Sequence, residues 1–266
     1  MNNIVDYTFT KGKFTEDQLE SSIIKLFEQA SCSANSTLKW QYRNGKQLKR
    51  KYDDELMEDI LRANLMERYA AIGLTDDEAQ IVVNELKQIP STPLYEGAKK
   101  TFWLLNEGYT LRRENKNLPA AHIEYIDYNN LDANDFLIVN QYSVQGYELR
   151  RPDLLCFVNG IPVAIWEFKT AIEEDKTVHD AWEQICIRYR RGIPNLLKYC
   201  MLAVICDGVN TRLGTPFTKY EYFYAWNKAN EQDKVSNGIS ALYTMIEGAF
   251  APDRLLAILR DFVFFP

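Results

Sequence analysis

The sequence predicts an α/β fold, a mixed β-sheet flanked by helices, in which residues 53–108 form a helical insertion. Two observations predict this fold class. Helical apolar periodicity dominates the chain up to about residue 108, whereas apolar runs typical of strands begin near residue 122. A helical pattern at 174–191 then separates two buried strand patterns, which is the arrangement of a parallel crossover. We therefore expect residues 1–266 to form a single domain.

The first elements are predicted helices joined by polar segments. Thr15 begins a T-x-x-Q capping pattern, and apolar residues then recur at helical spacing. Residues 31–52 are predicted to be irregular, and the basic residues of their second half are typical of a solvated loop. Thr75, followed by three acids, is a good helix cap because the acids favour the helix dipole. The three helices predicted after this loop cover residues 53–71, 75–89 and 94–107.

The second half of the chain shows short apolar runs bounded by turn residues, which predict strands. Two helices are predicted after the strands, with Pro252 near the start of the second. The last residues, FVFFP, either pack on the core or mark a fragment of a longer protein, and we favour the fragment because bare phenylalanines at a natural terminus would face water. The predicted strands cover residues 122–128, 134–144, 153–158, 162–169, 199–206, 211–214 and 219–226.

Composition excludes several classes of protein. The chain is 46% hydrophobic and 26% charged, as ordinary globular proteins are, and no apolar run is long enough to span a membrane. The formal net charge of −6 argues against a surface that coats nucleic acid as a whole, but it permits a local basic groove. Five scattered cysteines without a C-x-x-C pair predict buried, reduced thiols in a cytoplasmic protein. The sequence contains neither a Walker A motif nor G-x-G-x-x-G, so it has no recognisable nucleotide-binding loop.

Three charged residues interrupt two apolar strands that flank the hairpin signal Asn159-Gly160. Asp153 opens the first strand, and Glu167 and Lys169 close the second, two apart and therefore on one face. Two carboxylates are the oxygen ligands that Mg²⁺ uses, with water and substrate phosphate completing its shell. A neighbouring lysine can orient or deprotonate the attacking water, so the three residues would form a complete site for phosphodiester hydrolysis.

The register of this hairpin decides whether the site can form. With a two-residue loop, Asp153 would pair with Trp166 and lie on the face opposite Glu167. A three-residue loop, 159–161, together with a bulge would pair Asp153 with Glu167 directly, so the chemistry predicts that longer loop. Pro162 suits an irregularity because it has no amide hydrogen for the ladder.

The residues alone leave a structural alternative open. Asp153 follows a proline and is compatible with a simple turn, and Glu167 with Lys169 is compatible with an ion pair on an edge strand.

The run RRPDLLCFVNGIPVAIWEFK resembles the signature of the PD-(D/E)-x-K nuclease superfamily. More specifically, it is similar to the N-terminal nuclease domain of the R subunit of type I restriction–modification enzymes. Further similarity lies in NDFLIVNQYSV before this run and in IPNLLKY, AVICDGVNTRLGT and YAW after it. The resemblance implies a restriction-endonuclease-like core, with Asp153 and Glu167 as Mg²⁺ ligands and Lys169 as the catalytic lysine.

The resemblance also implies residues outside the hairpin. Family members carry Q-x-x-x-Y on the following helix, but here Gln184 and Tyr189 are one residue further apart. This spacing predicts either a local π-type bulge or one side chain that points elsewhere. Glu20 is the best candidate for an acid of the first helix that faces the metal, although by propensity it is an ordinary solvated helix residue. Five arginines fit either solvated positions or phosphate contacts beside the site: Arg150, Arg151, Arg188, Arg190 and Arg191.

The function implied by the resemblance is a metal-dependent endonuclease that cleaves double-stranded DNA after ATP-driven translocation. ATP would bind only to motor domains that follow this stretch in the longer chain. The implied partners are the modification and specificity subunits of the same complex. The alternatives are a module with a nuclease fold that binds DNA or a partner without cleaving, and a stand-alone repair or junction nuclease. A Walker A motif downstream in the same reading frame would favour the restriction subunit.

Overall fold

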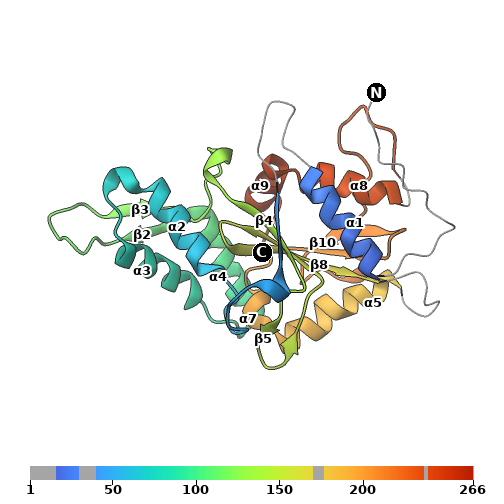
Figure 1. The fold of residues 1–266 in the computed structure, drawn as a ribbon, viewed down its shortest axis with the longest axis horizontal. Helices are drawn as coiled ribbons and strands as arrows, with labels where there is room; N and C mark the ends of the chain where they lie inside the picture. The colour runs from blue at the N-terminus through green and yellow to red at the C-terminus, as the bar shows by residue number, and fades with distance from the viewer. Residues whose placement is uncertain (1–15, 30–39, 170–176, 237–238, 266) are drawn as a thin grey trace.

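A computed structural model of the chain describes residues 16–29, 40–169, 177–236 and 239–265. Its centre is a six-stranded sheet with the order β1-β4-β7-β8-β9-β10 (Figure 1). The pairs β1·β4 and β8·β9 are parallel and the other three pairs are antiparallel, so the predicted mixed sheet is confirmed. The strands are β1 (Gln41–Asn44), β4 (Phe136–Asn140), β7 (Leu154–Val158), β8 (Ile161–Phe168), β9 (Leu202–Cys206) and β10 (Thr211–Gly214).

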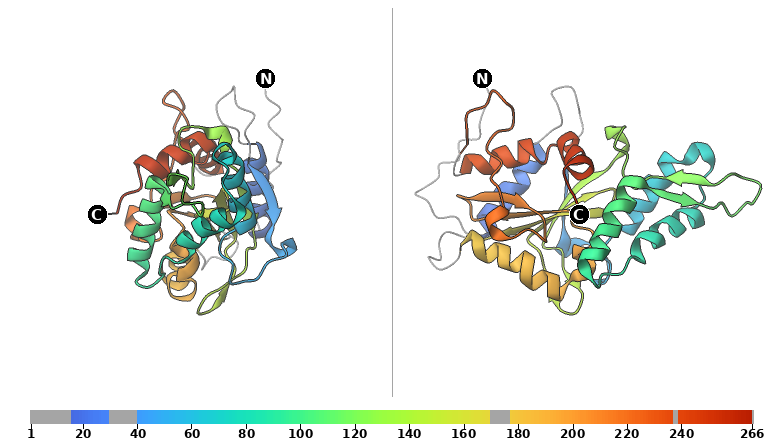
Figure 2. Two further views of the ribbon diagram at one scale, coloured as in Figure 1. Left: turned by 90° about the vertical axis from the view of Figure 1, so that its left-hand side faces the viewer. Right: turned by 180° about the vertical axis from the view of Figure 1, so that it is seen from behind.

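Helices cover both faces of this sheet, as the two views of Figure 2 also show. On one face lie α1 (Glu16–Gln29), α8 (Ile239–Gly248) and α9 (Pro252–Asp261), whose apolar side chains pack with Trp166 of β8 in one core cluster. The other face is covered by a continuous helical stretch and a short helix. These are α5 (Val178–Glu183), a π-helix (Gln184–Tyr189), α6 (Arg190–Gly192) and α7 (Pro194–Leu197), which pack with Ile165 in a second cluster.

The predicted helices between residues 53 and 108 are present at one end of the sheet (Figure 1). Met57 N donates to Gly160 O (2.9 Å), and Asn159 Nδ2 donates to Tyr125 O (2.9 Å). These bonds fix the closed end of the β7–β8 hairpin near the start of the helical insertion. The open end of the hairpin, with Asp153 and Glu167, lies at the other end of the strands. The helices are α2 (Glu58–Arg68), α3 (Asp76–Lys87) and α4 (Leu94–Glu107).

A buried ion pair anchors α3. Thr75 caps the helix as predicted, in a reciprocal capping box with Glu78. Glu78 is only 1% exposed, and Arg113 Nε donates to its Oε1 at 2.8 Å. The amide of Glu114 donates to the same oxygen at 3.0 Å, so this carboxylate joins the start of α3 to the segment after β2 (Tyr109–Leu111).

The hairpin turn differs from the prediction. Asn159 (φ 50°) and Gly160 (φ 79°) form a two-residue turn, since Val158 pairs with Ile161, and the predicted three-residue loop is wrong. The extra residue lies instead in a bulge, because Phe157 pairs with Pro162 whereas Cys156 pairs with Ala164.

The bulge moves every later pair by one residue. Leu154 therefore pairs with Trp166, and Asp153 comes opposite Glu167, which is the juxtaposition that the chemistry requires. The physical reason is that Asn and Gly accept positive φ, while Pro162 cannot donate to the ladder beside the bulge.

Three other predicted segments also differ. Residues 41–44, predicted to be irregular, form the edge strand β1 because they pair with β4. Of residues 122–128, only the start is a strand, β3 (Ala121–Ile123), which pairs with β2 outside the main sheet. Residues 219–226 contain a 3₁₀ turn (Tyr220–Tyr222) and one bridge between Leu213 and Tyr224 in place of a strand.

The segment after β4 leaves the sheet at Gln141, whose φ is 54°. It continues into a short hairpin of β5 (Val144–Gln145) and β6 (Leu149–Arg150). Four cysteines, Cys156, Cys186, Cys200 and Cys206, are free and buried as predicted, whereas Cys32 lies outside the described residues. Among the helices described, none has the length and apolar character needed to cross a bilayer.

Candidate active site

The open end of the β7–β8 hairpin brings three charged residues to one face. Glu167 lies two residues after Ile165 in β8, so both side chains lie on the sheet face that α5 to α7 cover. Lys169 follows two residues later on the same face, and Asp153 precedes β7 opposite Glu167. The alternation that buries Trp166 under α1 thus directs the predicted site towards the helical stretch with Tyr189.

Hydrogen bonds fix the three side chains. Lys169 Nζ donates to Glu167 Oε1 at 3.0 Å, and Phe168 N donates to Asp153 Oδ2 at 2.7 Å. The hydroxyl of Tyr189 donates to the other oxygen of Glu167, Oε2, at 3.0 Å. Glu167 is 1% exposed and Lys169 9%, whereas Asp153 is half-buried, so the pair of carboxyls opens to solvent on the side of Asp153.

The electrostatics of the site disfavour a charged carboxylate at Glu167. Burial, and next the charge of Asp153, raise the pKa of the Glu167 carboxyl well above its ordinary value, although Lys169 acts in the other direction. Asp153 and Glu167 repel each other, and a divalent cation between them would offset this repulsion. Mg²⁺ commonly uses one or two protein carboxylates and keeps its other ligands as water, so Asp153 and Glu167 fit it. No cluster of three or more Asp, Glu, His or Cys ligands occurs in the described part of the chain.

We expect Mg²⁺ to raise the melting temperature more at about pH 8 than at about pH 5.5. Because the folded state raises the pKa of Glu167, the resulting stability is full below the ordinary value of 4.5 and is lost as the pH rises through the folded value. Mg²⁺ replaces the proton, so its effect grows where the carboxyl is deprotonated. Differential scanning fluorimetry at the two pH values measures this shift. A Mg²⁺ effect independent of pH, or one retained in full by Asp153→Asn, would contradict the metal assignment.

The helical stretch that packs against Glu167 accommodates the extra residue between Gln184 and Tyr189. Residues Gln184–Tyr189 form a π-helix, whose wider turn places these two residues on the same side. Gln184 Nε2 donates to the Tyr189 hydroxyl at 2.8 Å, and that hydroxyl donates to Glu167. Of the two predicted outcomes the π-type bulge is therefore confirmed, and both side chains belong to the network at Glu167.

The sequence also matches a known protein family. A family model described as the N terminus of the type I restriction enzyme R protein matches residues 13–222. The chain belongs to this family. The matched range includes Glu20, Arg150, Arg151, Arg188, Arg190 and Arg191, the other predicted site residues.

Similar proteins carry names from the same family. The chain is 27% identical to a putative type I restriction enzyme MjaIXP endonuclease subunit of Methanocaldococcus jannaschii, over 97% of this chain and 27% of the relative. It is 26% identical to the type I restriction enzyme HindI endonuclease subunit of Haemophilus influenzae, over 90% of this chain and 24% of the relative. The chain thus spans about a quarter of the length of these relatives.

Glu20 lies apart from the other acids of this R protein domain. It belongs to α1, on the sheet face opposite the helical stretch with Tyr189. Asn140 Nδ2 donates to its Oε1 at 2.6 Å, and Gln141 Nε2 donates to its Oε2 at 2.5 Å. Glu20 therefore reaches the same end of the sheet, where β4 ends, but among the described residues it does not join Asp153 and Glu167 in a cluster of three metal ligands.

The five predicted DNA-binding arginines make different contacts. Arg150 pairs with Glu148, Arg188 lies 3.7 Å from Glu183, and Arg190 stacks on Phe217 at 5.2 Å from the ring centroid. Arg151 and Arg191 are exposed, and the main-chain oxygen of Arg151 lies 3.5 Å from the Tyr189 hydroxyl. Arg151 is thus the arginine whose backbone is tied to the site, and phosphate contact by all five stays a prediction.

Sequence reasoning assigned no role to Asn140 and Gln141, which hold Glu20. The sequence does mark their position, because Asn140 ends the wholly buried strand β4 and Gln141 follows it. Polar side chains beside a buried strand are costly unless they have hydrogen-bond partners.

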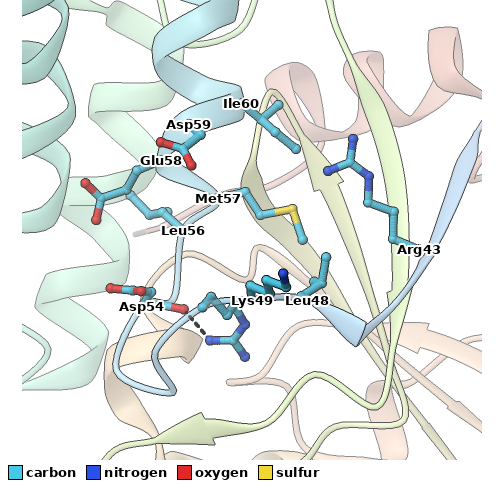
Figure 3. A pocket seen from close by; sticks show the side chains of 10 residues that line it. Arg43, Leu48, Lys49, Asp54, Leu56, Met57, Glu58, Asp59 and Ile60 are labelled. Atoms are coloured by element: carbon cyan, nitrogen blue, oxygen red, sulfur yellow. Dashed lines mark hydrogen bonds between the residues drawn. The ribbon is translucent and has the colours of Figure 1, made fainter. Parts of the chain in front are cut away.

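A separate pocket of about 390 Å³ lies between the segment after β1 and the start of α2 (Figure 3). It contains none of the predicted site residues, and its charges are mixed. Its lining residues are Arg43, Leu48, Lys49, Arg50, Asp54, Leu56, Met57, Glu58, Asp59 and Ile60.

Proposed function

We propose that this chain is a Mg²⁺-dependent nuclease domain that cleaves double-stranded DNA as part of a type I restriction enzyme. The observation that carries the proposal is the buried Glu167 carboxylate, which faces Asp153 and accepts a hydrogen bond from Lys169 Nζ at 3.0 Å. Family membership supports it, because the relatives are named endonuclease subunits.

The side chains have distinct proposed roles. Asp153 and Glu167 would hold Mg²⁺, which when bound supplies positive charge at the phosphate and lowers the pKa of a water. Lys169, as a cation, would orient the attacking water and oppose the charge that develops on the phosphate, while the proton of that water passes to solvent. Tyr189 and Gln184 keep Glu167 in one orientation through consecutive hydrogen bonds. Burial and the charge of Glu167 raise the pKa of Tyr189, so the phenol stays a neutral donor.

The remaining functions belong to the whole restriction enzyme. We infer that motor domains outside this stretch bind ATP and translocate the DNA before it is cut, and that modification and specificity subunits choose the sequence. The complex would act in the cytoplasm. The complete set of Asp153, Glu167 and Lys169 argues against a module that only binds DNA or a partner. A match over 97% of the chain to an endonuclease subunit argues against a stand-alone repair nuclease.

The test is cleavage of two unrelated supercoiled plasmids by the purified chain. We expect slow nicking of both plasmids in Mg²⁺ and none when EDTA removes the metal. Low ionic strength is needed because the net charge of −6 leaves only local clusters to contact phosphates. Nicking that persists in EDTA would refute a metal-dependent nuclease. Strong preference for one plasmid sequence would point to a self-sufficient restriction enzyme.

A further inference from the structure

Gln141 connects the two acids that approach the site edge from opposite faces of the sheet. Its side-chain amide donates to Glu20 Oε2 at 2.5 Å. Its main-chain amide donates to the carbonyl oxygen of Asp153 at 3.0 Å. One residue therefore contacts the first helix through its side chain and the start of β7 through its backbone.

The backbone of Gln141 adopts a conformation that side chains disfavour. Its φ of 54° lies in the left-handed region, and Asn159 is the other described non-glycine residue with positive φ. A turn alone would favour Gly or Asn at this position. Glutamine accepts the same turn less readily, but its longer side chain reaches Glu20. The strained backbone together with the long amide therefore points to a positioning role.

The neighbours of Gln141 fix the same arrangement. The Tyr42 hydroxyl donates to Asn140 Oδ1 at 3.1 Å, which leaves Asn140 Nδ2 to donate to Glu20. Gly45 packs on this turn so closely that a Cβ there would lie 2.4 Å from Asn140 O and 2.8 Å from Gln141 O. Both oxygens of Glu20 are thus held by amides on a rigid support, and each keeps a lone pair for a water.

We propose that Gln141 is a positioning residue that fixes Glu20 relative to Asp153, so that Glu20 orders water around the cation held by the carboxylate pair. The inference rests on the proposed function and extends it. Glu20 acts through water because amides already occupy one position on each of its oxygens. Gln141 contacts neither the cation nor the DNA.

The test uses two substitutions that separate the backbone of Gln141 from its side chain. Gln141→Gly relieves the left-handed backbone but removes the amide that reaches Glu20. Gln141→Asn tolerates the turn and keeps an amide, which is one methylene too short. Gln145→Gly, at an exposed glutamine of β5, is the matched control.

Mg²⁺ binding measured by calorimetry without DNA provides a readout apart from cleavage. We expect Gln141→Gly to weaken Mg²⁺ binding about tenfold while its melting temperature stays equal or rises. Gln141→Asn should fall between Gly and the wild type, and Gln145→Gly should bind as the wild type does. The Mg²⁺ concentration for half-maximal nicking should rise by the same factor.

A double-mutant cycle with Glu20→Gln tests whether Gln141 acts through Glu20. We expect each single variant to weaken Mg²⁺ binding similarly and the double variant to lose no more than either. Additive losses, or wild-type affinity in Gln141→Gly, would overturn the role of Gln141 alone. Failure of the wild-type chain itself to bind Mg²⁺ would overturn the proposed function and this inference with it.

Discussion

Lys169→Met should reduce plasmid nicking by about a hundredfold or more while the protein stays folded. Methionine has a similar length, so it fills the buried position, but it can neither hold a proton nor oppose the charge on the phosphate. The raised pKa of Glu167 lets this carboxyl take up a proton when its lysine is lost, which limits the cost in stability. Nicking rates, with circular dichroism to verify the fold, measure the effect.

Asp153→Asn provides a second variant at the same site. Its side-chain oxygen can still accept the hydrogen bond from Phe168 N, but one of two like charges is removed. Cleavage should therefore be lost although the melting temperature stays the same or rises. Lys46→Met, at an exposed lysine after β1, is the control and should cut at the wild-type rate. An active Lys169→Met or Asp153→Asn protein would refute the catalytic roles.

Glu78→Ala should lower the free energy of unfolding at neutral pH, because it removes a buried carboxylate that accepts hydrogen bonds from Arg113 Nε and from the amides of Thr75 and Glu114. Arg113 and the capping hydrogen bonds lower the pKa of Glu78 to about 2. The stability that this shift provides is full above the ordinary value of 4.5 and is lost as the pH falls towards 2. The difference between wild type and variant should therefore shrink in acid.

Urea unfolding at about pH 7 and about pH 3 measures this difference. The control is Asp77→Ala, an exposed acid of the same helical turn, which should cost far less. Equal losses for the two variants would mean that the helix dipole, and not the buried pair, accounts for the effect of Glu78. A loss that does not depend on pH would contradict the lowered pKa.

The sequence predicts the fold and the central residues of the site where chemistry interrupts a strong pattern. Asp153, Glu167 and Lys169 stand out because charges break apolar strands, and that contrast needs no structure. The position of the extra hairpin residue could not be predicted, since a longer turn and a bulge at Val163 give the same final pairing. The short turn is held by distant partners, since Asn159 Nδ2 donates to Tyr125 O and to Asn134 Oδ1 in the segment between β3 and β4.

Elements stabilised by distant partners were the least predictable. Residues Gln41–Asn44 are polar and become a strand only because β4 lies alongside them. Residues 219–226 have the alternation of a strand, but Leu213 and Tyr224 form a single bridge there. The partners of Gln141 could likewise not be predicted, although two amides at the end of a buried strand mark its position, because these partners lie 121 and 12 positions away in the sequence.

The π-helix at Gln184–Tyr189 shows how a one-residue insertion can be absorbed by a helix without displacing what precedes it. The extra residue widens one turn, and everything after it is rotated by about 100° relative to an uninterrupted α-helix. Such a chain keeps its hydroxyl on Glu167 although the spacing of the motif has changed. Nuclease motifs of this kind are therefore better defined by the atoms that meet than by the number of residues between letters. A search that requires three intervening residues would miss the contact between Gln184, Tyr189 and Glu167 in this chain.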